Sequence, residues 1–105
     1  LGDIGRHFPD SDPKYKGISS LVLLEEVGRL LAEGGFRVHN IDATIVAERP
    51  RMAPHIPAMA ANIAAAAGVE RSSVNVKATT TEGLGYTGRG EGMAAYAVCL
   101  IRKAE

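Results

Sequence analysis

Apolar and polar residues alternate between Asn40 and Ala47 with the two-residue period of a β-strand. The apolar positions of this stretch predict a face that packs on a core, with Asp42 and Thr44 on the opposite face. The preceding residues Phe36–Val38 alternate in the opposite phase. We therefore expect a β-bulge or a separate lead-in near His39.

Two further strands are predicted in the C-terminal part of the chain. Residues 74–79 are apolar on one face and polar on the other, and we expect them to form the central strand of the sheet. Residues 93–101 are apolar on both faces. Helices can cover only one face of so small a sheet, so the other face is expected to pack against another subunit.

Two helices are predicted between these strands. The first has apolar residues at helical spacing, with Ser19 or Ser20 placed to cap it and Gly34–Gly35 placed to end it. The second begins near Pro54–Pro57 and continues to Gly68, with a packing face of alanines. Helices and strands in this order predict an α+β domain.

Residues 1–18 are predicted to be a loop, because prolines and glycines interrupt them. The segment Asp10–Asp12 has the residue types of an incomplete metal loop. Pro13 and Lys14 follow where a calcium loop needs further oxygen ligands and a glycine. An Asx-turn is therefore the favoured interpretation.

Length and composition limit the classes of function. The 105 residues are enough for one domain, residues 1–105, with a modest core. Twelve Lys and Arg balance twelve Asp and Glu, which argues against a nucleic-acid or membrane-surface binder. Cys99 lies in an apolar run and is expected to be a small core residue. A single cysteine, with no membrane span or signal peptide, favours a cytoplasmic setting, and a start at Leu1 predicts a fragment.

The stretch Thr79–Gly92 concentrates the polar chemistry of the chain. Three consecutive threonines (Thr79–Thr81), Glu82 and Arg89 occur here among five glycines. Glycine permits positive-φ conformations in which successive N–H groups converge on an anion. This inventory suits a diphosphate with a divalent cation. On composition alone, a glycine-rich hairpin with solvated threonines and glutamate is an equally open alternative.

Other motif interpretations are weaker. Gly83–Gly88 has the letters of a dinucleotide fingerprint, but a strand follows it where the fingerprint needs a helix. The glycine spacing of a P-loop occurs without its Lys-Ser/Thr. His7, His39 and His55 show no short ligand spacing, and each is expected to be a surface or capping histidine.

The stretch resembles the C-terminal signature of the methylerythritol cyclodiphosphate synthases, a family of enzymes of the non-mevalonate isoprenoid pathway. The resemblance rests on Lys77–Glu82 and Gly85–Gly92, and it extends through Gly2–Gly5, Phe8–Asp12 and Arg51–Pro57 in the family's order. It implies a mixed sheet with helices on one face. It also implies a homotrimer whose sheets surround a three-fold axis, with active sites between neighbouring subunits.

The implied reaction is cyclisation of 4-diphosphocytidyl-2-C-methyl-D-erythritol 2-phosphate to 2-C-methyl-D-erythritol 2,4-cyclodiphosphate with release of CMP. Such a substrate supplies both the nucleophile and the leaving group. The protein has to fold the substrate for in-line attack and neutralise charge on the phosphoryl oxygens. No Ser-His or Cys-His arrangement is needed for this reaction, and none is seen.

By resemblance, Glu82 holds a divalent cation (magnesium or manganese) between two phosphates. Thr80 donates a hydrogen bond to the transferring phosphoryl group, assisted by Thr79 and Thr81. The resemblance also implies contacts with the rest of the substrate. The residues implied at the ribose are Asp3, Ile4 and Gly5. Those implied at the methylerythritol phosphate are Phe8, Pro9, Asp10, Ser11 and Asp12, and those implied around the cytosine, largely through backbone atoms, are Ala47, Glu48, Arg49, Pro50, Arg51, Met52 and Ala53.

Two further positions are implied to border a central cavity that takes isoprenoid diphosphates: Tyr86, where phenylalanine is common, and Arg89. Arg89 has an alternative role in a structural ion pair with Glu91. Arg51 stands where lysine is common, which keeps the charge and changes its shape.

The family's zinc-type site uses an Asp-x-His pair and a further histidine, all N-terminal to the region present here. Two alternatives therefore stay open beside the cyclase. One is a catalytically incomplete cytidine-nucleotide-binding or structural trimer core. The other is the C-terminal part of a bifunctional protein with an upstream cytidylyltransferase domain.

Overall fold

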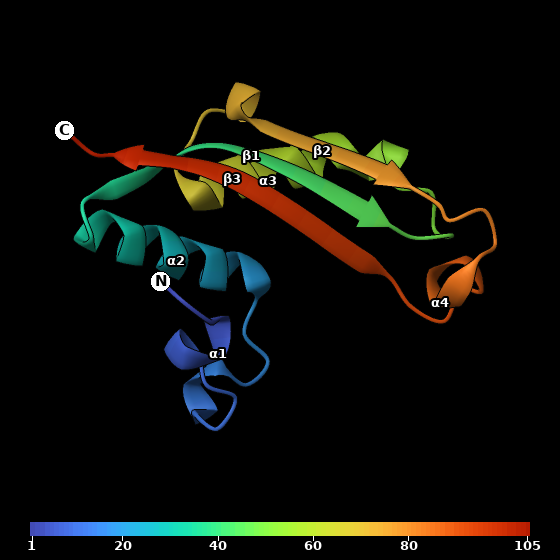
Figure 1. The fold of residues 1–105 in the computed structure, drawn as a ribbon, viewed down its shortest axis with the longest axis horizontal. Helices are drawn as coiled ribbons and strands as arrows, with labels where there is room; N and C mark the ends of the chain where they lie inside the picture. The colour runs from blue at the N-terminus through green and yellow to red at the C-terminus, as the bar shows by residue number, and fades with distance from the viewer.

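A computed structural model describes all 105 residues, which form one three-stranded sheet with helices beside it (Figure 1). Strand β1 (Phe36–Val46) lies in the middle. Strand β2 (Val74–Thr79) pairs with it in parallel, and β3 (Ala94–Lys103) pairs with it antiparallel on the other side. The expected α+β class and mixed sheet are confirmed.

The prediction that residues 74–79 form the central strand is wrong, because β2 is an edge strand. An alternating pattern shows that one face is buried, but it does not show how many neighbours a strand has. Asn75 and Lys77 on the polar face of β2 are compatible with an edge position. The central strand is the longer β1, and the β-bulge expected near His39 is confirmed by the register shift between Val38 and Asn40.

The two main helices begin and end where the sequence predicts. Helix α2 (Ser20–Glu33) is capped by the Ser19 hydroxyl, which accepts a hydrogen bond from the Leu21 N–H at 3.2 Å. Helix α3 (Ile56–Ala67) ends at Gly68, whose φ of 73° is left-handed. Glycine adopts this conformation at little steric cost, which explains the sharp stop.

Two single-turn helices, α1 (Ile4–His7) and α4 (Gly85–Gly88), lie in segments predicted to be loop. Each is one turn long, too short for an apolar period to reveal it. The Asx-turn prediction is confirmed at Asp12, whose carboxylate accepts a hydrogen bond from the Lys14 N–H at 3.1 Å.

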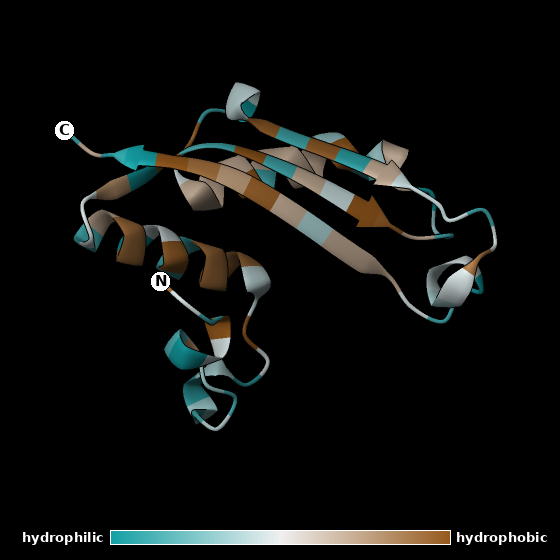
Figure 2. Cartoon of the chain, viewed as in Figure 1, coloured by the Kyte–Doolittle hydropathy of each residue, from teal (hydrophilic) through white to brown (hydrophobic).

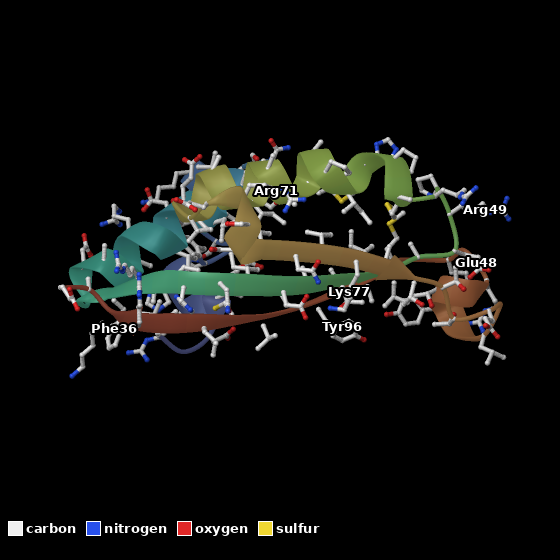
Figure 3. The ribbon with its side chains drawn as sticks, turned by 90° about the horizontal axis from the view of Figure 1, so that it is seen from above. Phe36, Glu48, Arg49, Arg71, Lys77 and Tyr96 are labelled. Carbon is white, nitrogen blue, oxygen red and sulfur yellow. The ribbon has the colours of Figure 1, made fainter.

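The core is small and lies between α3 and the sheet. Ala60 and Ala64 of α3 pack against Val74 and Val76 of β2, with partly buried β1 side chains completing the cluster. Both helices lie on this side of the sheet, and the other face carries none (Figure 3). The expected arrangement of helices on one face is thus confirmed. No helix is both long and apolar enough to cross a membrane.

Strand β3 is apolar along most of its length (Figure 2) and is poorly covered. Tyr96 and Val98 are each 65% exposed. The expectation that Cys99 is a core residue is wrong, because it too is exposed. The helices lie over β1 and β2 and leave β3 largely open, so an apolar sequence here does not produce burial within the chain.

An ion pair joins two strands on the helix-free face. The Lys77 ammonium and the Asn75 amide both donate hydrogen bonds to the Asp42 carboxylate, at 2.8 to 2.9 Å. The hydrogen bond from Lys77, followed by that from Asn75, lowers the pKa of Asp42 from its ordinary value of 3.8. This network therefore stabilises the fold above that value and is lost as the pH falls through the lowered pKa.

We expect Asp42→Asn to destabilise the protein at about pH 6 and to have a smaller effect at an acidic pH well below 3.8, because the lowered pKa of Asp42 is approached there and the wild type loses the charge as well. The urea midpoints of both proteins at the two pH values measure this difference. Because the pair is solvent-exposed, its contribution also decreases with added salt. An unchanged gap between the two midpoints at both pH values would show that Asp42 contributes nothing through its charge.

Candidate functional site

A groove lies where the parallel strands β1 and β2 end at the same edge of the sheet. Its volume is about 220 Å³. The loop that follows β1 forms one wall, and the end of β2 forms the other. We call it the strand-end groove; its lining residues are Ala47, Glu48, Pro50, Arg51, Met52, Ala53, Ile56, Ala78, Thr79 and Thr80.

The groove brings together two motifs that are far apart in the sequence. Six of the seven residues expected around the cytosine line it, and so do two of the three threonines. Arg49, the seventh, is exposed and is not part of the lining (Figure 3). Ile56 and Ala78 were not expected to line it; as apolar neighbours of the two motifs, they carry no polar signal that marks them as site residues.

The segment after β2 folds back on itself through left-handed backbone conformations. Glu82 has a φ of 53°, and Gly83 and Gly85 have φ values of 82° and 72°. The turn α4 then closes the segment before β3 begins. The hairpin alternative is wrong, because β2 and β3 are not paired but lie on opposite sides of β1.

Gly88 is required by a close approach of two backbone segments. A Cβ atom at this position would lie 2.2 Å from the carbonyl carbon of Gly83. No side chain can be accommodated at that distance without moving backbone. The contact holds α4 against the segment that carries Glu82.

The three threonine hydroxyls have different hydrogen-bond partners. Thr79 donates to the carbonyl of Thr80 at 3.1 Å. Thr81 is bonded to the carbonyl of Leu84 and lies 3.0 Å from the hydroxyl of Thr87, which is buried. Thr80 accepts from the Glu82 N–H at 3.2 Å and has no acceptor within the chain. Thr80 therefore keeps its hydroxyl hydrogen free for a ligand.

Thr87 is a residue that the reasoning from sequence missed. Its hydroxyl is hydrogen-bonded to the hydroxyl of Thr81, and its side chain is buried although most of the surrounding loop is exposed. Its place inside the Gly85–Gly92 motif was the available signal. Of the threonines in this region, Thr80 is thus the free donor, whereas Thr79, Thr81 and Thr87 are hydrogen-bonded within the loop.

Two carboxylates in this region, those of Glu82 and Glu48, lack a partner within the chain. Glu82 is exposed and takes part in no ion pair, whereas Glu91 binds Arg89 at 2.7 Å. Glu48 lines the groove, and one of its carboxylate oxygens is buried without a hydrogen-bond partner. A lone carboxylate beside a phosphate site fits magnesium or manganese, which take one or two carboxylates and complete their coordination with phosphate and water.

No group of three or more His, Cys, Asp or Glu side chains is close enough to hold a metal ion. A zinc site generally takes three or four such ligands. The residues present therefore fit the magnesium-type ion expected at Glu82, and they do not by themselves form a zinc centre.

The N-terminal site residues lie apart from the groove within this chain. The segment carrying α1 sits beside α2, away from the α4 end of the sheet (Figure 1). It holds the residues expected at the ribose and at the methylerythritol phosphate: Asp3, Ile4, Gly5, Phe8, Pro9, Asp10, Ser11 and Asp12. Asp3 caps α1 by accepting a hydrogen bond from the Gly5 N–H at 3.4 Å, and Phe8 packs edge-on against Tyr15.

Tyr86 and Arg89 lie at α4, outside the groove. Tyr86 is about half exposed. Arg89 forms the ion pair with Glu91 that was one of its two expected roles. The pair is exposed and leaves part of the guanidinium accessible to other groups.

Comparison with known proteins gives a consistent match. The model of the YgbB family matches residues 1–102. Proteins named 2-C-methyl-D-erythritol 2,4-cyclodiphosphate synthase are 59% identical over 103 residues in Clostridium perfringens and 62% identical over 104 residues in Alkaliphilus oremlandii. The matches cover 98% and 99% of this chain, which spans 66% of the length of each relative.

Solved structures agree with the fold. The bifunctional IspDF of Campylobacter jejuni matches 98% of this chain with a TM-score of 0.92 and 41% identity, over 28% of its own length. A 2C-methyl-D-erythritol-2,4-cyclodiphosphate synthase in its CDP-bound form matches 97% of the chain with a TM-score of 0.86 and 30% identity, over 65% of its own length. The same arrangement of strands and helices thus occurs in proteins of that name.

Proposed function

Because this chain belongs to the YgbB family, we propose that it is the larger part of a cyclodiphosphate synthase. The proposed enzyme converts 4-diphosphocytidyl-2-C-methyl-D-erythritol 2-phosphate to 2-C-methyl-D-erythritol 2,4-cyclodiphosphate and releases CMP. The observation that carries this proposal is the strand-end groove, in which the loop Ala47–Ala53 meets Thr79 and Thr80. The CDP-bound form of a related synthase supports the binding of a cytidine nucleotide, and we propose that this groove is where it binds.

The two walls of the groove are proposed to contact different parts of the substrate. The loop after β1 offers backbone groups and the apolar side chain of Met52 to a flat base, and Ile56 at the start of α3 adds a second apolar side chain. Arg51 lies in the same lining and supplies a planar, permanently charged group for phosphate oxygens. The base is thereby anchored on one side, and the diphosphate extends toward the threonines.

Thr80 is the residue best placed to act on the transferring phosphoryl group. Its hydroxyl hydrogen is free, while its oxygen is oriented by the hydrogen bond from the Glu82 N–H. A donor fixed in this way stabilises charge that develops on the phosphoryl oxygens, and one such donor contributes roughly 3 kcal/mol in the transition state. Thr79 and Thr81 act by holding the loop, because their hydroxyls are bonded within the chain.

The carboxylate of Glu82 would hold the divalent cation. When bound, this ion supplies neutralisation of charge on the α- and β-phosphates. Within the chain itself, Glu82 has a left-handed backbone conformation just after β2 and forms no ion pair with a basic side chain. The carboxylate therefore stays available for a cation.

The ribose and methylerythritol-phosphate residues reach a substrate only if a neighbouring copy supplies them. Asp3 and the segment Phe8–Asp12 lie away from the groove of their own chain (Figure 1). We propose that the protein is a homotrimer in which the helix-free faces meet around the three-fold axis and each active site lies between two subunits. Tyr86 and Arg89 would then border the central cavity proposed for isoprenoid diphosphates.

The direct test is release of CMP from the cytidine-linked substrate in the presence of magnesium and zinc. We expect CMP and the cyclic diphosphate to form in equal amounts. Removal of divalent cations with EDTA should stop turnover, while CDP should still raise the melting temperature through the groove. Nucleotide binding without CMP release under all metal conditions would favour the catalytically incomplete nucleotide-binding core, and absence of both would contradict the proposal.

A further inference from the structure

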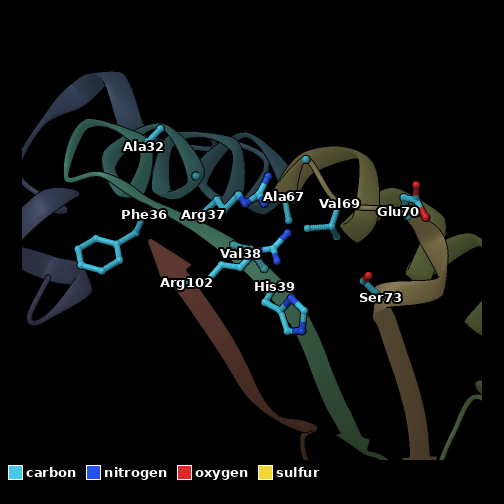
Figure 4. Close-up of a pocket in the computed structure, with 12 residues that line it drawn as sticks. Ala32, Phe36, Arg37, Val38, His39, Ala67, Val69, Glu70, Ser73 and Arg102 are labelled. Carbon is cyan, nitrogen blue, oxygen red and sulfur yellow. The ribbon is translucent and has the colours of Figure 1, made fainter. Parts of the chain in front are cut away.

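A second polar cavity lies at the end of the sheet opposite the strand-end groove. Its volume is about 420 Å³, and it is enclosed by the last turns of α2 and α3, the start of β1 and the end of β3 (Figure 4). Arg37, His39, Ser73 and Arg102 line it, and apolar Val69 forms part of the wall. The proposed cyclase function uses none of these residues.

Two arginines line this cavity, and neither has a carboxylate counter-ion. Arg37 of β1 and Arg102 of β3 are directly opposite in the strand register, and their guanidinium groups both extend into the cavity (Figure 4). Like charges at opposite positions of paired strands destabilise a sheet. Neither arginine takes part in an ion pair, whereas Arg29, Lys77 and Arg89 each have a carboxylate partner.

The local backbone contributes to this convergence. The β-bulge between Val38 and Asn40 leaves His39 outside the regular pairing, next to the arginines. A bulge re-aims the side chains around it and is frequent beside functional sites. In this chain, the bulge brings the imidazole of His39 to the cavity wall that carries the two arginines.

We propose that this cavity binds a phosphate-bearing anion at a site separate from the strand-end groove. Two guanidinium forks match the oxygens of a phosphate or diphosphate and would bind it with charge-assisted hydrogen bonds. The hydroxyl of Ser73 and the imidazole of His39 supply further donors on the same lining. Glu70 also lines the cavity, but its carboxylate is directed away from the arginines (Figure 4), which confines the anion to the arginine side.

Pyrophosphate is the probe for this site, measured by isothermal titration calorimetry at constant ionic strength. The titration is made with saturating CDP, so that the strand-end groove is already filled. We expect pyrophosphate to bind under these conditions, and Arg37→Gln/Arg102→Gln to weaken it by about tenfold or more. The single variant Arg102→Gln should give an intermediate loss, and thermal melts establish that each variant is folded.

Lys103→Gln is the matched control, because it removes a neighbouring positive charge that does not line the cavity. It should change the affinity by no more than about twofold. The inference is overturned if pyrophosphate does not bind once CDP is saturating, or if the double arginine variant binds as tightly as the wild type. If CDP does not bind and no CMP is released, the cyclase proposal is contradicted, whereas the pyrophosphate affinities of the wild type and the double arginine variant still test the proposed anion site.

Discussion

Replacing Glu82 by glutamine is expected to slow CMP release by about 100-fold or more at saturating magnesium. Glutamine keeps the size of the side chain and removes the charge. Glu82 is exposed and has no partner within the chain, so its loss leaves no unpaired cation behind. The expected defect is therefore in turnover, and the fold should keep its melting temperature.

A KM-against-kcat split distinguishes this role from a general loss of substrate binding. With Glu82→Gln, kcat should fall, and the affinity for CDP in the absence of divalent cations should stay unchanged, because the groove lining does not include Glu82. Glu25→Gln, on the exposed face of α2, is the charge-matched control and should leave CMP release unchanged. A Glu82→Gln rate within about threefold of wild type would refute the cation-holding role.

The variant Gly88→Ala is expected to reduce both turnover and stability. The new methyl group would have to occupy space 2.2 Å from the Gly83 carbonyl carbon, so the segment carrying Thr80 and Glu82 must move. Forcing extra atoms into packed structure costs about 1–3 kcal/mol. A displacement of about 1 Å at a reacting centre can cost about 100-fold in rate.

The free energy of unfolding from urea titration and the rate of CMP release measure the two effects. Gly28→Ala is the matched control, because a Cβ there meets no atom within 4 Å and the residue lies inside a helix. That change should stabilise the protein by about 0.5–1 kcal/mol and leave turnover intact. Wild-type activity in Gly88→Ala would mean that the Gly83 contact does not position the catalytic segment.

The sequence predicts local structure well wherever a short-range physical rule applies. A cap at Ser19 or Ser20, a stop at Gly68 and a bulge or lead-in near His39 were each predicted from a few neighbouring residues, and the structure has the Ser19 cap, the Gly68 stop and the bulge. The residues of the strand-end groove were expected only through the family resemblance, and the parallel pairing of β1 and β2 brings their two motifs to one edge of the sheet.

Features that depend on which element lies beside which were not predictable in this way. The edge position of β2 follows from the order of the strands, and the exposure of Cys99 follows from helices that pack over β1 and β2 and leave β3 open; apolar periodicity encodes neither. Arg37 and Arg102 are 65 positions apart, and only the strand register brings them together. The bonding pattern that leaves Thr80 as the free donor needs the folded loop.

The two edges of the sheet differ in how they resist pairing with other chains. On β2, a short strand with Lys77 near its middle, charge discourages the addition of a further strand. On β3, no charged residue occurs between Ala94 and Ile101, and the backbone groups on the outer edge are open. A long, uncharged edge is a template for intermolecular β-pairing and aggregation. At high concentration, the β3 edge is therefore the segment of this polypeptide most open to intermolecular pairing.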